Sequence, residues 1–222
     1  MLKFHLNKGE TLFYTIIFHL CYNYIMYKNL YSRIADSLVI DGYIVVPDAL
    51  QEDISIQLLT LAKKNLGFQQ AGISASVDKH INSSKRRDTI LWIDEDKEIQ
   101  SVYLAFIQGL QEYLNSSLYL GIHYYESHFS IYKKGDFYEK HLDAFRGSKN
   151  RIVTTVFYLN EEWNKKDGGE LIIYNINEEK IKKVIPKINT LVVFLSDKFP
   201  HKVMKTNKNR YSIAGWYRVD KR

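Results

Sequence analysis

Three side chains in the second half of the chain have the types and spacing of a metal site. His141 and Asp143 lie two residues apart, after a turn that contains Gly135. In an extended backbone, residues i and i+2 point to the same face, so both side chains can reach one ion. His201 offers a third donor, and Pro200 fixes the backbone just before it. Two histidines and one carboxylate form the facial set of non-heme Fe(II) sites, which leaves positions open for substrates.

A candidate anion site follows in the last predicted strand. Arg210, Ser212 and Trp216 share one face of that strand. An arginine inside a barrel is costly unless it meets an anion, and its planar fork suits a carboxylate. Ser212 and Tyr158 can each add a hydroxyl group to such a site. The structural alternatives are an exposed arginine paired with an acidic side chain, a core tyrosine, and, for His201, a surface histidine at a strand edge.

The elements that must position these residues change in character near Gly121. Before it, helical spacing predicts one helix from Lys28 to Asp41 and a second from Ala49 to Leu66, with Asp48 as its N-cap. A third predicted helix is capped by Asp94 or Asp96 and runs to about Asn115. Two strands are predicted in the same half, at Tyr43–Val46 and Thr89–Ile93. After it, β-branched and aromatic runs predict strands at Phe129–Lys133, Arg151–Leu159, Glu170–Tyr174, Ile181–Ile185, Thr190–Leu195, Lys202–Thr206 and Arg210–Val219. Helices followed by seven or eight strands predict a β-sandwich or barrel braced by helices on one side.

Composition limits the class of protein. The 222 residues are 45% hydrophobic, which is enough for a full core, and no internal repeat or linker divides residues 27–222, so we expect a single domain there. The single cysteine, Cys21, excludes an intrachain disulfide and a multi-cysteine zinc site, and it is compatible with a cytoplasmic location. The net charge of +6 comes from dispersed lysines and arginines. Without a continuous basic stripe, we expect no direct nucleic-acid binding.

Residues 1–26 differ from the rest of the chain. Their apolar, aromatic run is not followed by a small-x-small cleavage site, and it contains His19 and Asn23. It is also shorter than the roughly 20 residues that a membrane span needs. We expect no stable membrane association, and we interpret the segment as a loosely docked extension or as the product of a start that belongs at Met26.

Together these residues resemble the 2-oxoglutarate and Fe(II)-dependent dioxygenases, and within them the prolyl 4-hydroxylase branch, which includes the hypoxia-sensing prolyl hydroxylases and bacterial relatives. The resemblance covers roughly residues 80–219 and rests on the order and spacing of several segments. These are Arg86-Arg-Asp88-Thr-Ile-Leu-Trp92, Tyr132-x5-Tyr138-x2-His141-x-Asp143, Arg151 to Asn160, Trp163 with Gly168 to Leu171, Pro200 to Val203, and Arg210 to Tyr217. The loops before His141 and His201 are each one residue shorter than in the animal oxygen sensors, which bears on substrate identity more than on chemistry.

The resemblance implies an α+β chain whose double-stranded β-helix, a jelly-roll or cupin-like barrel, is braced by N-terminal helices. It implies that His141, Asp143 and His201 bind Fe(II), and that no catalytic group separate from these ligands is needed. Arg210, Tyr158 and Tyr132 would contact 2-oxoglutarate. The substrate pocket would be shaped by Arg86, Asp88, Tyr138, Arg151, Ser212 and Trp216.

The implied reaction hydroxylates a prolyl residue of a protein and releases succinate and CO2. Its cosubstrates are 2-oxoglutarate and O2, and ascorbate is the supporting reductant. A translation factor or a ribosomal protein is the implied partner, and the irregular segment 67–87 is a candidate lid. The alternatives are a hydroxylase of a free amino acid or nucleic acid, and a catalytically silent binding module of the same fold. Presence of the full ligand set argues against the silent module.

Overall fold

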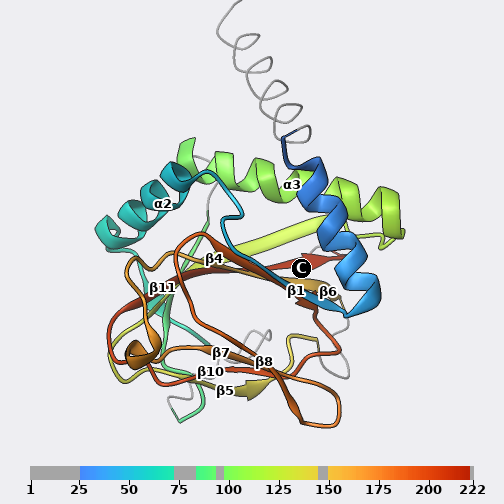
Figure 1. Cartoon of the computed structure of the whole chain (residues 1–222). Coiled ribbons are helices and arrows are strands. Elements are labelled where there is room, and N and C mark those ends of the chain that lie inside the picture. The colour runs from blue at the N-terminus through green and yellow to red at the C-terminus, as the bar shows by residue number, and fades with distance from the viewer. Residues whose placement is uncertain (1–25, 73–83, 94–97, 145–149, 221–222) are drawn as a thin grey trace, which may run out of the picture.

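The computed structural model describes residues 26–72, 84–93, 98–144 and 150–220. Within them, two antiparallel sheets lie face to face, and helices cover the outer face of the larger sheet (Figure 1). The helical segments are residues 26–40, α2 (Glu52–Lys64), α3 (Glu98–Leu118) and a 3-10 turn at Lys165–Asp167. This architecture confirms the predicted fold class.

The larger sheet has the strand order β1-β9-β6-β11-β4-β3-β2, and the smaller one has the order β5-β10-β7-β8. The larger sheet contains β1 (Tyr43–Val46), β2 (Gln69–Gln70), β3 (Thr89–Trp92), β4 (Tyr124–Tyr132), β6 (Arg151–Tyr158), β9 (Thr190–Leu195) and β11 (Arg210–Arg218). The smaller sheet contains β5 (Tyr138–His141), β7 (Leu171–Tyr174), β8 (Lys180–Val184) and β10 (His201–Val203).

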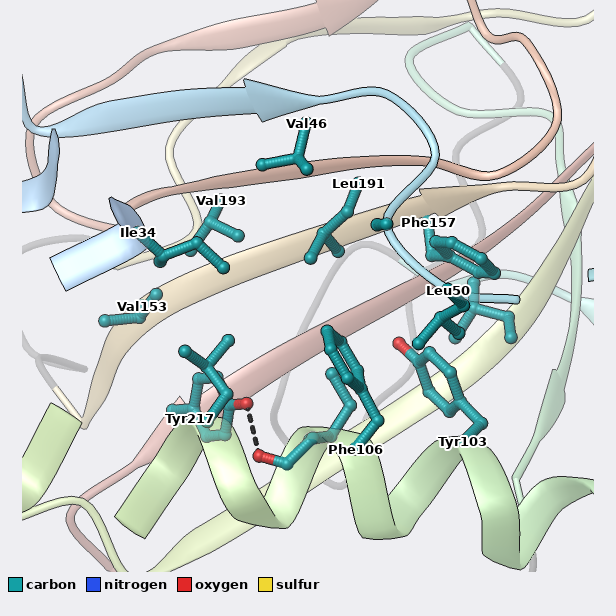
Figure 2. Close-up of a cluster of buried hydrophobic side chains, with 14 of the residues drawn as sticks. Ile34, Val46, Leu50, Tyr103, Phe106, Val153, Phe157, Leu191, Val193 and Tyr217 are labelled. Atoms are coloured by element: carbon teal, nitrogen blue, oxygen red, sulfur yellow. Dashed lines mark hydrogen bonds between the residues drawn. The ribbon is translucent and has the colours of Figure 1, made fainter. Parts of the chain in front are cut away.

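Alternation along the strands gives the larger sheet two different faces. Its outer face packs against the helices in one apolar cluster, where Phe157, Leu191 and Val193 meet Phe106 (Figure 2). The Tyr217 hydroxyl donates to the Ile107 carbonyl of α3 at 2.7 Å, which fastens that helix to the sheet. The inner face turns toward the smaller sheet, and its polar side chains are therefore the ones available to a site.

Several details of the sequence-based prediction need correction. Asp48 does not cap α2, because the helix begins at Glu52 with Gln51 as N-cap and no capping side chain. Strand β4 starts at Tyr124, five residues before the predicted position. The short β2 lies in the segment expected to be irregular.

Three other predictions fall wholly or partly on undescribed residues. The extension 1–26 and the caps Asp94 and Asp96 lie outside the described residues, apart from Met26. The same holds for 73–83 of the candidate lid. In the part of the chain that is described, no helix is both long and apolar enough to cross a bilayer.

The close approach of Tyr125 to Gly215 yields a stability prediction. A Cβ atom at Gly215 would overlap the Tyr125 hydroxyl, which contacts Tyr103 at 3.1 Å and Thr155 at 2.8 Å. We expect Gly215→Ala to lower the free energy of unfolding by about 1–3 kcal/mol, because the ring must move in a packed core. Urea unfolding of the variant measures this, and an unchanged midpoint would contradict the packing described.

Candidate metal centre

The smaller sheet brings the three candidate ligands together. His141 ends β5 and pairs directly with His201, the first residue of β10. Asp143 follows β5 by two residues, so its carboxylate turns toward the same point. Its oxygens lie 3.7 Å from Nε2 of His141 and 3.5 Å from Nε2 of His201. One donor atom from each residue lies within 4.8 Å of the other two, a spacing that could hold one metal ion.

Backbone carbonyls orient both imidazoles. The Nδ1 atom of His141 lies 2.8 Å from the Glu139 carbonyl, and that of His201 lies 3.0 Å from the Phe199 carbonyl. A carbonyl oxygen only accepts, so each Nδ1 carries the proton in these contacts. Each Nε2 is left with its lone pair directed toward Asp143, which is the state required of a metal ligand.

Local electrostatics favour the protonation states that bind a cation. Burial, and then the neighbouring His201, lowers the pKa of His141, so its ring is neutral. Burial opposes ionisation of Asp143, but His201, His141 and Arg151 outweigh it and lower the pKa of that carboxyl. A neutral imidazole at His141 and an ionised carboxylate at Asp143 are forms that coordinate a divalent metal.

A hydroxyl pair holds the carboxylate from the larger sheet. Thr154 on β6 donates to Oδ2 of Asp143 at 2.8 Å, and its hydroxyl also lies 2.8 Å from that of Ser196. All three side chains are buried. Because such supports orient the ligand, the carboxylate position depends on residues beyond the ligand set.

Removing the Thr154 hydroxyl should weaken metal binding. We expect Thr154→Val to lower the affinity for Mn(II) by about 10-fold, the scale typical of a lost ligand support. Thr155→Val is the matched control, because its side chain contacts Tyr125 rather than Asp143. Calorimetric titration with Mn(II) measures both, and equal affinities for the two variants would mean that Thr154 does not position the carboxylate.

Arg210 provides a buried cation at the other end of the inner face. The side chain is 1% exposed. It donates to the Gly169 carbonyl at 2.8 Å and to Ser212 at 3.1 Å, and no carboxylate of the described residues pairs with it. Its guanidinium lies over the rings of Tyr132 and Tyr158, 5.0 and 4.9 Å from their centres. An unpaired buried cation is unfavourable without an anion, so this geometry fits a carboxylate-bearing ligand.

Tyr158 adds an unused polar group beside this arginine. Its hydroxyl is buried and has no hydrogen-bond partner among the described residues. Burial raises its pKa to about 12 against the opposing effect of Arg210, so the phenol stays protonated. A protonated hydroxyl without a partner can donate to an acceptor on a ligand. Tyr158 therefore supports the interpretation that this end of the cavity fits a carboxylate-bearing ligand.

A cavity of about 320 Å³ lies between the sheets and connects the two groups. Ten of the twelve residues predicted for the site line it: His141, Asp143, His201, Arg210, Tyr132, Arg86, Tyr138, Arg151, Ser212 and Trp216. The other two, Tyr158 and Asp88, are fully buried and are not among the lining residues. Tyr158 contacts Arg210, and Asp88 forms an ion pair with Arg86 at 2.6 Å.

Ring stacking joins the cavity wall to the metal centre. Tyr138 stacks on His141, with 3.6 Å between ring centres, and Arg86 lies 4.7 Å from the Tyr138 ring centre. On the opposite wall, Arg151 covers the Trp216 ring at 3.8 Å and pairs with Glu126 at 2.7 Å. These cation–π contacts stabilise the side-chain positions in both walls of the cavity.

Sequence reasoning missed three polar residues of the site: Thr154, Ser196 and His128. Thr154 and Ser196 support Asp143, and His128 lines the cavity. Alternation along β6 and β4 was the available signal, since Thr154 shares a face with Tyr158, and His128 shares one with Tyr132. The cross-sheet contacts that give these residues their roles are not local in sequence.

Comparison with known proteins assigns the strand region to a family. Residues 127–218 match the model of the 2OG-Fe(II) oxygenase superfamily. Human prolyl hydroxylase EGLN3 is 34% identical over 160 residues, which are 67% of this chain and 64% of that protein. The chain therefore spans a little under two thirds of the length of this curated relative.

Solved structures extend the likeness to nearly the whole fold. A prolyl-4-hydroxylase from Pseudomonas putida superposes with a TM-score of 0.78 and 32% identity, over 86% of this chain and all of that one. A prolyl hydroxylase from Trichoplax adhaerens, solved in complex with a hypoxia inducible factor oxygen degradation domain peptide fragment, gives a TM-score of 0.74 and 25% identity over 91% of this chain and 93% of that one.

Proposed function

Because the chain belongs to the 2OG-Fe(II) oxygenase superfamily, we propose that it hydroxylates a prolyl residue of a protein substrate with Fe(II), 2-oxoglutarate and O2. The observation that carries the proposal is one cavity with two complementary ends. At one end, His141, Asp143 and His201 present three metal donors within 4.8 Å of one another. At the other end, Arg210 has no acidic partner among the described residues.

Each end of the cavity fits one part of the cofactor set. The two imidazoles and the carboxylate suit Fe(II) and leave coordination positions open. Arg210 would hold the distal carboxylate of 2-oxoglutarate, with hydroxyl donors from Tyr158 and Ser212 and a wall formed by Tyr132. When bound, Fe(II) and 2-oxoglutarate supply the oxidation: O2 is consumed, 2-oxoglutarate loses CO2 to give succinate, and one oxygen atom enters a C–H bond of the substrate.

The protein's own residues have three tasks in this reaction. The ligand set and Thr154 hold the metal, and Arg210 orients the cosubstrate. Aromatic rings, among them Tyr138 and Trp216, exclude water from the cavity. No side chain needs to act as a general base, because hydrogen is removed from carbon by the oxidant.

Relatives support a peptide as the substrate. The Trichoplax protein was solved with a peptide fragment, and the Pseudomonas protein is named a prolyl-4-hydroxylase. Within that class we propose a cytoplasmic target such as a translation factor or a ribosomal protein, to which a net charge of +6 is suited. The opening that receives the peptide would be shaped by Tyr138, Arg151, Trp216 and Arg86, and Asp88 would hold Arg86 in place. Ascorbate would serve as the supporting reductant.

A peptide library tests the proposal. The protein is incubated with Fe(II), 2-oxoglutarate, ascorbate and blocked peptides that each carry one central proline. We expect succinate to form, and mass spectrometry to find one added oxygen atom on proline in some of the peptides. Succinate without any modified peptide would refute the prolyl substrate, and absence of both succinate and bound metal would refute the oxygenase itself.

A further inference from the structure

His128 is a buried polar side chain to which the proposed chemistry gives no role. It lies on the inner face of β4, is 2% exposed and lines the cavity. In the sheet it pairs with Trp92 on β3 and Ala214 on β11. Its ring centre lies 5.2 Å from that of Trp92 and 5.4 Å from that of Trp216. Nε2 of His128 is not among the fully buried side-chain atoms of the described residues that lack a partner, so it remains reachable from the cavity.

Its neighbours select one tautomer. Nδ1 of His128 lies 3.3 Å from the Phe129 carbonyl and 3.1 Å from the Ser130 hydroxyl oxygen. The carbonyl can only accept, and the hydroxyl oxygen can also accept, so both contacts are satisfied when Nδ1 carries the proton. Nε2 then has a free lone pair, and it makes no hydrogen bond to any described residue.

The ring is held neutral by its surroundings. Burial, and then Arg86, lowers the pKa of His128 to about 4, with Asp88 opposing and Arg151 adding to the decrease. In neutral solution His128 is therefore a hydrogen-bond acceptor in the cavity wall. A carboxylate ligand has only acceptors and finds its donors near Arg210, so the cosubstrate is not the partner of His128. Nε2 of His128 is therefore available to a donor on a molecule that enters the cavity.

We propose that Nε2 of His128 accepts a hydrogen bond from the substrate peptide, from the N–H group of the residue that follows the reacting proline. This inference rests on the proposed function. A prolyl residue has no N–H group of its own, so the nearest backbone donor after the reacting ring is that of the next residue. The indoles of Trp92 and Trp216 flank the imidazole and shield the bond from water, which strengthens it. His128 is thus a specificity residue that reads the peptide backbone beside the reacting carbon.

An amide-to-ester exchange in the substrate tests the bond directly. A peptide that the wild-type enzyme hydroxylates is compared with its ester analogue, in which oxygen replaces the N–H group after the proline. We expect the ester to lower kcat/KM by about 3- to 10-fold in the wild type, the range for one lost hydrogen bond. In His128→Phe, which keeps a ring but lacks the acceptor, amide and ester should be equivalent. His123→Phe replaces an exposed histidine outside the cavity and should behave as the wild type.

The outcomes separate this inference from the function on which it rests. The ratio of kcat/KM for the amide peptide to kcat/KM for its ester analogue is taken within one enzyme. A general loss of activity in His128→Phe therefore cancels from this ratio. An equal ester penalty in wild type and His128→Phe would overturn the role of His128 alone. Succinate without any hydroxylated peptide would overturn the prolyl function and this inference together. If His128→Phe does not fold, nitrogen-15 spectra of the wild-type ring decide, because a proton on Nε2 at neutral pH contradicts the proposal.

Discussion

Replacing Arg210 with methionine should raise the KM for 2-oxoglutarate by about 100-fold or more. The guanidinium is buried and has no acidic partner among the described residues, so the ligand carboxylate is its expected counter-ion. Removing one member of a buried charge pair leaves the other unpaired, which costs about 3–5 kcal/mol and corresponds to a change of this size. Peptide-independent succinate formation, measured across a range of 2-oxoglutarate concentrations, gives the KM.

Two further variants show which property of Arg210 matters. Arg210→Lys keeps the positive charge but loses the planar fork, and it should fall between wild type and Arg210→Met. Tyr158→Phe removes only the unpartnered hydroxyl and should raise the KM by about 3- to 10-fold. A KM for 2-oxoglutarate in Arg210→Met within 3-fold of wild type would mean that this end of the cavity does not hold the cosubstrate.

Substitution of His141 by alanine should abolish metal binding and turnover while the fold survives. His141 lies at the end of β5, and its side chain is 20% exposed, so the cavity left behind opens to solvent. With two donors remaining, we expect the Mn(II) affinity to fall by at least about 100-fold, since removing only a ligand's support already costs 10- to 100-fold. Calorimetric titration with Mn(II) and a succinate assay measure the two losses.

Exposed His123 offers the matched control for this change. His123→Ala removes an imidazole outside the cavity and should leave metal affinity and turnover unchanged. Thermal unfolding of both variants in the absence of metal should agree with the wild type within a few degrees. Turnover retained by His141→Ala would mean that the ligand set has been assigned wrongly.

Local patterns were sufficient to predict a β-sandwich or barrel braced by helices, and the resemblance supplied the double-stranded β-helix. Runs of β-branched and aromatic residues mark β6, β9 and β11, whose side chains are buried on both faces over most of their length. Boundaries were less secure where tertiary contacts decide them. Asp48 has a favourable residue type for an N-cap, but its φ is 51°. Two residues later, the Leu50 backbone forms two hydrogen bonds, of 2.9 and 2.7 Å, with the Asn189 side chain. That contact joins residues 139 positions apart and leaves no local signal.

The candidate site was predictable where its residues are close in sequence or distinctive in type. His141 and Asp143 are two residues apart, and Arg210 is a charged residue at the start of a strand whose middle is mostly apolar and aromatic. His201 is distant from both in sequence; the resemblance indicated it as a ligand, and the pairing of β10 with β5 is what brings it to His141. Thr154, Ser196 and His128 are ordinary residue types in β-rich sequence, and only the approach of the two sheets shows what they contact.

Heavy oxygen gas provides the most direct test of the central claim, that this chain couples oxidation of 2-oxoglutarate to hydroxylation of proline. Wild-type protein with Fe(II), 2-oxoglutarate and a peptide substrate would be incubated under oxygen-18, and the products weighed by mass spectrometry. We predict one heavy atom in succinate and one on the peptide proline, in equal amounts. Heavy succinate with an unmodified peptide would contradict the coupling to proline, and absence of heavy oxygen from succinate would contradict the oxygenase chemistry.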